Sequence, residues 1–443
     1  MYRVVVIGGG WSGCAAALTA RKAGAEVLLL EKTDMLLGLG NVGGIMRNNG
    51  RFTAAEENIA LGADELFGIT DKCSRHINID FPGHKHASLY DVTKVEPEVR
   101  RLLKEKGIEI RFMARAVDVI MQSAQPGDAD ICSFAERRQE LFIRKLILAG
   151  GEEVEGDVFV ETTGSTGGPG NCLTYGNGCC MCILRCPAFG PRVSISAKAG
   201  GSDIMGRRKD GAFGAFSGSG KLEKQSLSEE IQQILNEKGV AVIPLPRDAI
   251  KKEKLDMKVC KQYALDEFAE NIVLLDTGYA KIMTPFFDLE ALRKIPGFEN
   301  ARYVDPYAGS KGNSIRYLSV AERDDSMKAL GIGNLFCGGE KSGLFVGHTE
   351  AISTGSLAGH NAVRFLKGMK YLQLPAGLAI GDLISYANKS LEKEDGLMTR
   401  FTFAGAEYFE RMKEKGLYEV DREEIGKRVR RYDLEGIYRE KLM

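Results

Sequence analysis

The most unusual chemical feature of this 443-residue sequence is a stretch rich in cysteine. Residues 171–190 read NCLTYGNGCCMCILRCPAFG and hold half of the ten cysteines. The spacing Cys179-x2-Cys182-x3-Cys186, with a proline directly after it, repeats the closing half of the bacterial ferredoxin pattern, in which cysteines wrap the backbone around an iron–sulfur cluster. Cys172 is the candidate fourth ligand. The pattern therefore predicts a [4Fe–4S] cluster held by Cys172, Cys179, Cys182 and Cys186.

Three other uses of these thiols stay open. A tetrahedral zinc site also accepts C-x2-C pairs, although it usually has two such pairs far apart, and here there is one. Cys179 and Cys182 also have the C-x-x-C spacing of redox thiols that react with a flavin. Plain burial is the third alternative, since cysteine is often a small core residue. Cys180 is either an alternative ligand or a free thiol.

Length and composition indicate a globular protein of two or three domains, because 443 residues exceed what one hydrophobic core usually serves. The 60 basic and 60 acidic residues cancel, so no net charge favours nucleic acid or anionic lipid. The N-terminus begins with an apolar strand pattern in place of a signal peptide, and no apolar run reaches the roughly 20 residues that cross a bilayer. We therefore expect a cytosolic protein without a membrane segment, in which a dense cysteine group serves a metal or redox site.

A dinucleotide-binding pattern opens the chain. Residues 4–30 predict a buried strand, a helix of small side chains and a second strand. Between the first strand and the helix, Gly8, Gly10 and Gly13 have the G-x-G-x-x-G spacing. In this motif the first glycine allows a tight turn, the second lets the backbone approach a pyrophosphate, and the third lets the helix pack on the strand. Glu31, at the end of the second strand, is placed to accept hydrogen bonds from ribose hydroxyls.

Two later segments favour FAD over NAD. Residues 157–164 read DVFVETTG and residues 334–340 read NLFCGGE, so each is a strand that ends in glycine and polar residues. They resemble the segments that close the FAD domain of flavoproteins with two dinucleotide domains. The FAD-site residues that this resemblance implies, besides the N-terminal motif, are Thr163, Gly164, Gly339, Glu340 and Gly347, the last opening a helix that points at the isoalloxazine.

Residues 334–364 resemble the signature of the glucose-inhibited division protein A family and of its relative, the folate-dependent tRNA uracil-5-methyltransferase. In those proteins a glycine-rich strand end precedes a Gly-x-x-Glu-Ala helix and a Gly-x-x-Ala-Gly-x-Asn-Ala run. The matching residues here are Gly347, Glu350, Ala351, Gly355, Ala358, Gly359, Asn361 and Ala362. The wider likeness covers roughly residues 2–165 and 330–365. It implies an FAD-binding domain and, as an alternative function, modification of tRNA uridine.

Two departures weigh against that alternative. The tRNA-modifying relatives carry a cysteine in the loop after the second strand, whereas the corresponding residues 38–50 contain none. The charge balance also lacks the basic footprint of an RNA-binding protein. From the sequence we therefore do not expect nucleic acid as a partner.

The predicted fold class is α/β, with a Rossmann-type FAD-binding domain that is interrupted by an α+β substrate and cluster domain. The predicted parts are the FAD-binding domain at 1–165 and 329–370, the insert at 166–328 and a helical C-terminal segment at 371–443. Residues 111–120 and 141–148 alternate in the manner of strands and predict a small antiparallel sheet within the first part.

His348 and Arg316 are the predicted catalytic residues. His348 opens the helix expected to meet the flavin, where an imidazole can pass a proton. Arg316, followed by Tyr317 and Arg323, offers a fork that suits a substrate carboxylate or phosphate. The alternative is that these arginines pair at the surface with Asp324 and Asp325. His84 is expected in an exposed loop.

These features together predict an FAD-dependent oxidoreductase with a [4Fe–4S] cluster. Because a cubane passes one electron at a time, the flavin would exchange electrons with a ferredoxin-like or other one-electron partner, or with a small-molecule substrate. The alternatives are a tRNA-modifying flavoenzyme and a non-catalytic electron-transfer subunit that docks a partner. Each is compatible with a homo-oligomer.

Overall fold

The computed structural model describes residues 3–123, 141–165, 186–207, 211–213, 215–216, 218–256, 261–284, 287–304, 315–316, 319–393 and 395–443. Three of the predicted cluster ligands, Cys172, Cys179 and Cys182, lie outside these residues. The backbone of Arg316 is described as part of β17 (Ile315–Arg316), but its side chain is not.

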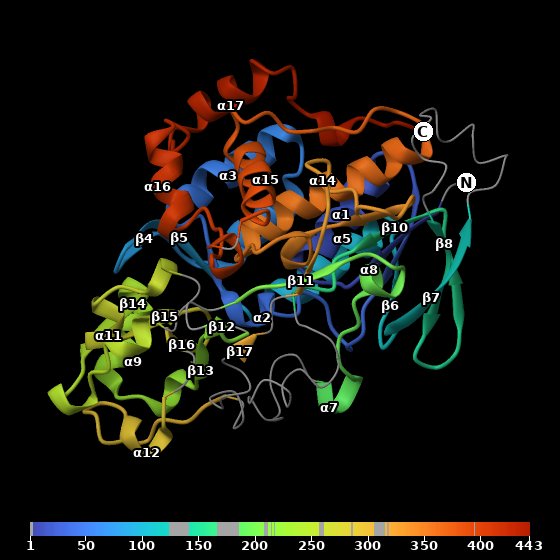
Figure 1. Ribbon diagram of the computed structural model, residues 1–443. Coiled ribbons are helices and arrows are strands. Elements are labelled where there is room, and N and C mark those ends of the chain that lie inside the picture. Colours follow the sequence, from blue (N-terminus) through green and yellow to red (C-terminus); the bar gives the residue numbers. More distant parts are fainter. Residues whose placement is uncertain are drawn as a thin grey trace.

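A parallel five-stranded sheet forms the centre of the molecule (Figure 1). Its strands in spatial order are β19 (Leu335–Cys337), β10 (Val158–Glu161), β1 (Arg3–Ile7), β2 (Glu26–Leu30) and β6 (Glu109–Arg111). Apart from β6, these are runs of Val, Leu, Ile and Phe that are almost entirely buried, as expected for parallel strands covered on both faces. The predicted α/β fold class is confirmed.

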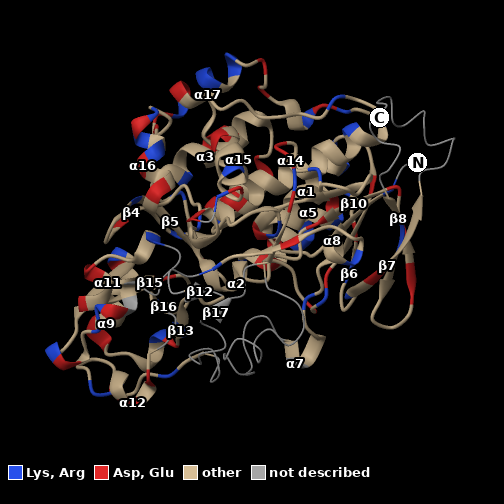
Figure 2. Ribbon diagram, in the orientation of Figure 1, with Lys and Arg blue, Asp and Glu red and all other residues tan. Residues whose placement is uncertain are grey.

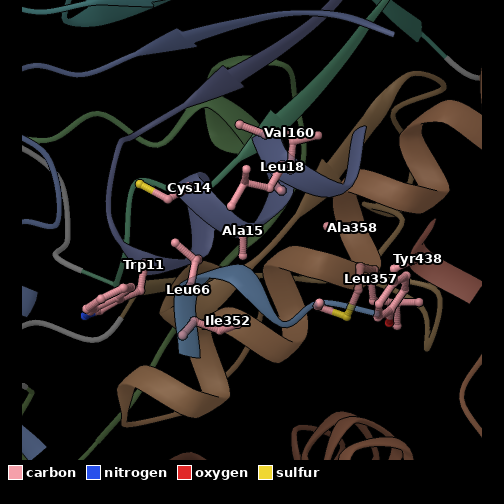
Figure 3. Packing of buried hydrophobic residues seen from close by; sticks show 14 of the residues in the cluster. Trp11, Cys14, Ala15, Leu18, Leu66, Val160, Ile352, Leu357, Ala358 and Tyr438 are labelled. Carbon is pink, nitrogen blue, oxygen red and sulfur yellow. The ribbon is translucent and has the colours of Figure 1, made fainter. Parts of the chain in front are cut away.

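Two helices that are far apart in the sequence cover one face of this sheet. They are α1 (Trp11–Lys22) and α14 (His348–Leu366), and small side chains of both, such as Ala15 and Ala358, belong to one buried hydrophobic cluster (Figure 3). Glycines on α14 permit this contact, because a Cβ on Gly355 would lie 2.2 Å from the Ser12 carbonyl oxygen, and one on Gly359 would lie 2.2 Å from that of Ala16. The close approach fixes the N-termini of both helices at the same edge of the sheet.

A small antiparallel sheet covers the opposite face. It contains β7 (Ala116–Ser123), β8 (Leu141–Leu148) and β9 (Glu153–Glu155), and the predicted antiparallel sheet is confirmed. The predicted strand at 111–120 is wrong in its bounds, however. Arg111 ends β6 in the parallel sheet, and Met113 has a left-handed φ of 55°, which breaks the chain before β7 begins.

The insert is built around a four-stranded antiparallel sheet. The strands in order are β13 (Gly220–Leu222), β16 (Ala280–Ile282), β15 (Asn271–Asp276) and β14 (Val240–Pro244), and α9 (Glu229–Lys238) packs on them. A second sheet of β3 (Ile45–Met46), β5 (His84–Tyr90) and β4 (Ser74–Phe81) belongs to the first part of the chain. Side chains of the two sheets form one hydrophobic cluster, which joins the insert to the dinucleotide part.

The C-terminal helices pack into the same core as the central sheet. They are α15 (Ala379–Ser390), α16 (Ala406–Glu414) and α17 (Arg422–Arg430), and they surround α3 (Gly50–Leu61) (Figure 1). Acidic and basic residues alternate along α16 and α17, as Figure 2 shows. Within the described part of the chain, no helix has both the length and the hydrophobicity needed to cross a bilayer.

Candidate functional site

One cavity of about 310 Å³ runs along the carboxyl ends of the central strands and reaches the insert. The sequence-predicted site residues that line it are Gly8, Gly10, Glu31, Thr163, Gly164, Gly339, Glu340, Gly347 and His348. Gly13 lies within α1, behind the wall of the cavity. The structure thus brings together residues from three distant segments, as expected at the switch point of a doubly wound sheet, where neighbouring connections leave in opposite directions.

The glycines of the N-terminal motif do different work. Gly8 has a φ of 104°, and a Cβ there would lie 2.6 Å from the Thr162 carbonyl oxygen. At Gly13 a Cβ would lie 1.8 Å from the carbonyl oxygen of Gly8. By contrast, a Cβ on Gly10 would meet no atom within 4 Å, so the backbone there faces open space. The turn is therefore packed tightly on its protein side and left open on the side where a pyrophosphate would lie.

Unsatisfied donors mark the same open side. The N-terminus of α1 has no side-chain cap, so its first N–H groups remain available to an anion. Ser12 Oγ is buried on the cavity wall and has no hydrogen-bond partner among the described residues. Buried donors of this kind usually have partners, and a bound dinucleotide would supply them. The residues present therefore fit FAD.

Glu31 and Glu340 lie at separate points along the cavity. Glu31 accepts hydrogen bonds from the Gly9 amide at 2.8 Å, from the Thr33 amide at 2.8 Å and from Thr33 Oγ1 at 2.9 Å. A carboxylate has about four acceptor positions, so these bonds orient Glu31 and still leave it able to accept from a ribose hydroxyl. Glu340 accepts from Ser165 Oγ at 2.8 Å. Contacts of both carboxylates with a cofactor stay a prediction.

A buried ion pair supports the other end of the cavity, where α14 begins. Glu350 is fully buried and accepts from Arg51 Nε at 3.1 Å, from Thr402 Oγ1 at 2.7 Å and from the Phe403 amide at 2.9 Å. This carboxylate thus ties α14 to α3 and to the C-terminal segment. The pair lies directly beside Gly347, where an added Cβ would be 1.9 Å from Glu350 Oε2.

His348 lies at this end and contacts two aromatic side chains. Its ring centroid is 5.9 Å from that of Trp11 and 6.1 Å from that of Tyr90. Tyr90 Oη is 3.2 Å from His348 Nδ1. The sequence prediction that His348 opens the helix at the expected flavin position agrees with this location, while its catalytic role stays a prediction.

Comparison with known proteins identifies the family. The model of the family described as "Glucose inhibited division protein A" matches residues 3–271 and 277–370. The chain belongs to this family. The resemblance noted from the sequence is therefore confirmed, and FAD is the cofactor that the cavity fits.

Individual relatives match shorter segments. Methylenetetrahydrofolate--tRNA-(uracil-5-)-methyltransferase TrmFO of Caldicellulosiruptor bescii is 36% identical over 94 residues, which is 21% of each chain. The tRNA uridine 5-carboxymethylaminomethyl modification enzyme MnmG of Thermus thermophilus is 31% identical over 114 residues, 24% of this chain and 18% of its own. These matches thus span about a fifth of the curated relatives.

Among solved structures, GidA of Aquifex aeolicus in its form II crystal has a TM-score of 0.61 and 16% identity. The match covers 97% of this chain and 76% of that one. It shows that the fold of the family extends through the insert and the C-terminal helices.

In this family member, the insert forms the outer wall of the cavity. The residues that it and its connections contribute are Arg192, Val193, Gly218, Ser219, Gln262, Tyr263, Lys281 and Met283. Lys281 is buried on β16, and its ammonium donates to the Val42 carbonyl oxygen at 2.8 Å and to Ser219 Oγ at 2.7 Å. Sequence reasoning missed Lys281, because no local pattern distinguishes a strand lysine that faces a cavity from one that faces solvent.

Two further sequence expectations need correction. Arg323 does not line the cavity. Its guanidinium pairs with Asp325 at 3.4 Å, as the alternative predicted, but it is buried rather than at the surface, and it also donates to the carbonyl oxygens of Ser342 at 2.9 Å and Ile384 at 3.0 Å. His84 does not lie in an exposed loop: it begins β5, is buried, and contacts the Gln262 carbonyl oxygen through Nε2 at 3.0 Å. Burial lowers the pKa of His84 to about 3, so it stays neutral and structural.

The described residues do not test the predicted iron–sulfur cluster. Within the described residues, no group of three or more His, Cys, Asp or Glu side chains is arranged to hold a metal. Cys186 is described, at the start of the short helix α7 (Cys186–Phe189), and is partly exposed. The other three predicted ligands lie outside the described residues, so the cluster stays a prediction. Cys337, at the end of β19, is buried, and burial raises the pKa of its thiol.

Proposed function

We propose that this protein is an FAD-dependent enzyme that modifies uridine in tRNA. The observation that carries the proposal is the extent of the family match. It runs through residues 166–271 and resumes at 277, so it includes the insert that forms the outer wall of the cavity. A match confined to the dinucleotide motif would support only a flavoprotein fold. The curated relatives that match at 31% and 36% identity are named as tRNA-modifying enzymes.

The division of labour within the cavity follows from its geometry. Gly8, Gly10 and Ser12, at the N-terminus of α1, would hold the pyrophosphate of FAD, and Glu31 would hold a ribose. When bound, FAD supplies hydride or electron transfer. His348 lines the opposite end, where we propose that its imidazole moves a proton to or from the reacting base.

The loop after the second strand contains no cysteine, and this limits the chemistry that the site can perform. Gly38, Leu39, Gly40, Val42 and Gly43 line the cavity, and none of residues 38–50 is a cysteine. A thiol from this loop therefore cannot activate the base, as the resemblance would have implied. The reaction proposed here relies instead on proton transfer by His348.

The test combines binding with product analysis. FAD-loaded protein is titrated with tRNA at increasing salt concentrations, and tRNA isolated from a strain without this gene is incubated with the protein and its nucleosides are analysed by mass spectrometry. We expect the logarithm of the affinity to fall linearly with the logarithm of salt concentration, since phosphate contacts release counterions. We also expect a new modified uridine. A tRNA affinity that does not change with salt concentration, together with an unchanged set of nucleosides, would reject the proposal.

A second candidate, an FAD oxidoreductase with a [4Fe–4S] cluster and a one-electron partner, is favoured by one observation. The spacing of Cys179, Cys182 and Cys186 repeats a ferredoxin pattern, with Cys172 as the fourth ligand. Anaerobic purification followed by measurement of iron, sulfide, zinc and FAD distinguishes the candidates. About four irons and four sulfides per FAD would support the cluster. FAD without iron would remove it and leave the tRNA proposal alone.

A further inference from the structure

Tyr90 forms a bridge between His348 and the backbone of a cavity-lining loop. Tyr90 ends β5 and is completely buried. Its hydroxyl oxygen lies 2.7 Å from the Gly40 carbonyl oxygen and 3.2 Å from His348 Nδ1. The imidazole packs against Gly43, where an added Cβ would lie 1.7 Å from His348 Cε1. The ring is thus held on one side by a glycine surface and on another by the tyrosine.

The number of hydrogens available at this bridge determines which atom donates and which accepts in each hydrogen bond. A tyrosine hydroxyl has one hydrogen, and a carbonyl oxygen can only accept. The short contact with Gly40 therefore takes the Tyr90 hydrogen, and the tyrosine oxygen is left as an acceptor toward His348. It follows that Nδ1 of His348 is the donor in the 3.2 Å contact. A neutral imidazole has one N–H, so its lone pair is then on Nε2.

We propose that Tyr90 is a positioning residue, which holds His348 in the Nδ1–H tautomer so that Nε2 accepts the proton in the flavin cavity. This inference rests on the proposed function of His348 as a proton-transfer group. Tyr90 touches neither substrate nor cofactor in this scheme; it acts through the imidazole. The arrangement is the one by which a hydrogen bond to one ring nitrogen decides the protonation of the other.

Among the described residues, the charged groups nearest His348 are an ion pair at the start of α14. Arg51 on α3 and Glu350 on α14 face the N-terminus of α14, but they are paired with each other at 3.1 Å. Trp11 on α1 and Tyr90 on β5 are uncharged neighbours. Burial raises the pKa of Tyr90, so its hydroxyl keeps the hydrogen that it donates to Gly40.

Nitrogen NMR of the histidine rings tests the tautomer directly. The full chain, loaded with FAD and labelled with ¹⁵N-histidine, contains five histidines, and His348→Gln identifies the signal of interest. His84 serves as an internal reference of opposite tautomer, because its Nε2 must donate to the Gln262 carbonyl oxygen. We expect His348 to show a protonated Nδ1 and an unprotonated Nε2 near neutral pH. A protonated Nε2 in the neutral ring would overturn the proposal.

Substitution then tests the cause. In Tyr90→Phe the fixed acceptor is lost, and we expect both His348 tautomers to be populated. The matched control is Tyr303→Phe, which removes a buried hydroxyl that donates to the Phe287 carbonyl oxygen at 2.7 Å within the insert. It should leave the His348 signals unchanged. Unchanged His348 signals in Tyr90→Phe would reject the positioning role, and the wild-type spectrum already tests the tautomer should that variant not fold.

The kinetic readout separates this inference from the proposed function. If tRNA modification is observed, Tyr90→Phe should lower kcat by about 10-fold or more with KM unchanged, and should alter the pH profile of kcat, since proton transfer is impaired while binding is not. Tyr303→Phe should change neither. The tautomer is measured without substrate, so a correct tautomer with no tRNA modification would refute the proposed function alone.

Discussion

The two ends of the cavity are built in different ways. At the pyrophosphate end, backbone shape is decisive: Gly13 lets helix α1 touch the turn, Gly8 fits against Thr162, and Gly10 leaves space. At the end beside α14, side chains are decisive: Arg51, Glu350 and His348 are placed by contacts between segments far apart in the chain. Because the first end depends on glycine backbone and the second on paired side chains, they should respond differently to mutation.

The largest loss of stability is expected from removing the buried ion pair at the end of the cavity beside α14. Glu350→Gln removes the charge that compensates Arg51, and both side chains are buried. Leaving one member of a buried ion pair alone costs about 3–5 kcal/mol. We therefore expect the unfolding free energy in urea to fall by that amount. Glu424→Gln, which breaks an exposed pair with Lys427 on α17, is the control and should leave the urea midpoint unchanged. Equal behaviour of the two variants would contradict a structural role for the buried pair.

A smaller loss of stability is expected from adding a side chain to a glycine at the pyrophosphate end of the cavity. Gly13→Ala places a Cβ within 1.8 Å of the Gly8 carbonyl oxygen, so α1 must move from β1. Overpacking of this kind costs about 1–3 kcal/mol, and FAD affinity should fall by about 10-fold or more. Gly68→Ala is the control, because this exposed glycine in α4 (Glu65–Lys72) has no atom near its Cβ position. It should stabilise the helix slightly. Normal FAD affinity in Gly13→Ala would refute the packing argument.

The smallest effect should appear in binding alone. Ser12→Ala removes a buried hydroxyl that has no partner among the described residues, so stability without FAD should be unchanged. If the hydroxyl donates to the pyrophosphate, FAD affinity should fall by about 2- to 10-fold, equivalent to about 0.5–1.5 kcal/mol. Quenching of the single tryptophan, Trp11 on the cavity wall, provides the titration signal. Ser390→Ala, on α15, is the control. Unaltered affinity in Ser12→Ala would place the pyrophosphate elsewhere.

The same contrast explains what could be predicted from the sequence. Gly8, Gly10, Gly13 and Glu31 were predictable because their roles depend on spacing within one strand–turn–helix–strand unit. Tyr90 was not, because its partner His348 is 258 positions away and the chain between them holds no pattern that pairs the two.

The chemical type of a residue was not enough to predict its partners. For Arg323 the sequence left open either an anion in the cavity or pairing with Asp324 and Asp325. It pairs with Asp325, but its shorter contacts are with backbone carbonyl oxygens of distant segments, which no sequence pattern reveals. His84 was expected at the surface for lack of a visible ligand pattern, yet β5 carries it into a buried network with Asn48. Side chains whose partners are main-chain atoms of distant segments remain the hardest to predict.

The central sheet has a consequence for synthesis of the protein. Its middle strand β1 is made first, but β10 pairs on its other side with β19, and α14 covers α1 only after residue 366 has been made. The insert sheet, in contrast, uses segments from 220 to 282 and leaves the ribosome complete while the central sheet still lacks β19. Contacts of long sequence separation form late. The nascent chain must therefore keep its first strand and helix protected until more than four fifths of the polypeptide has been translated.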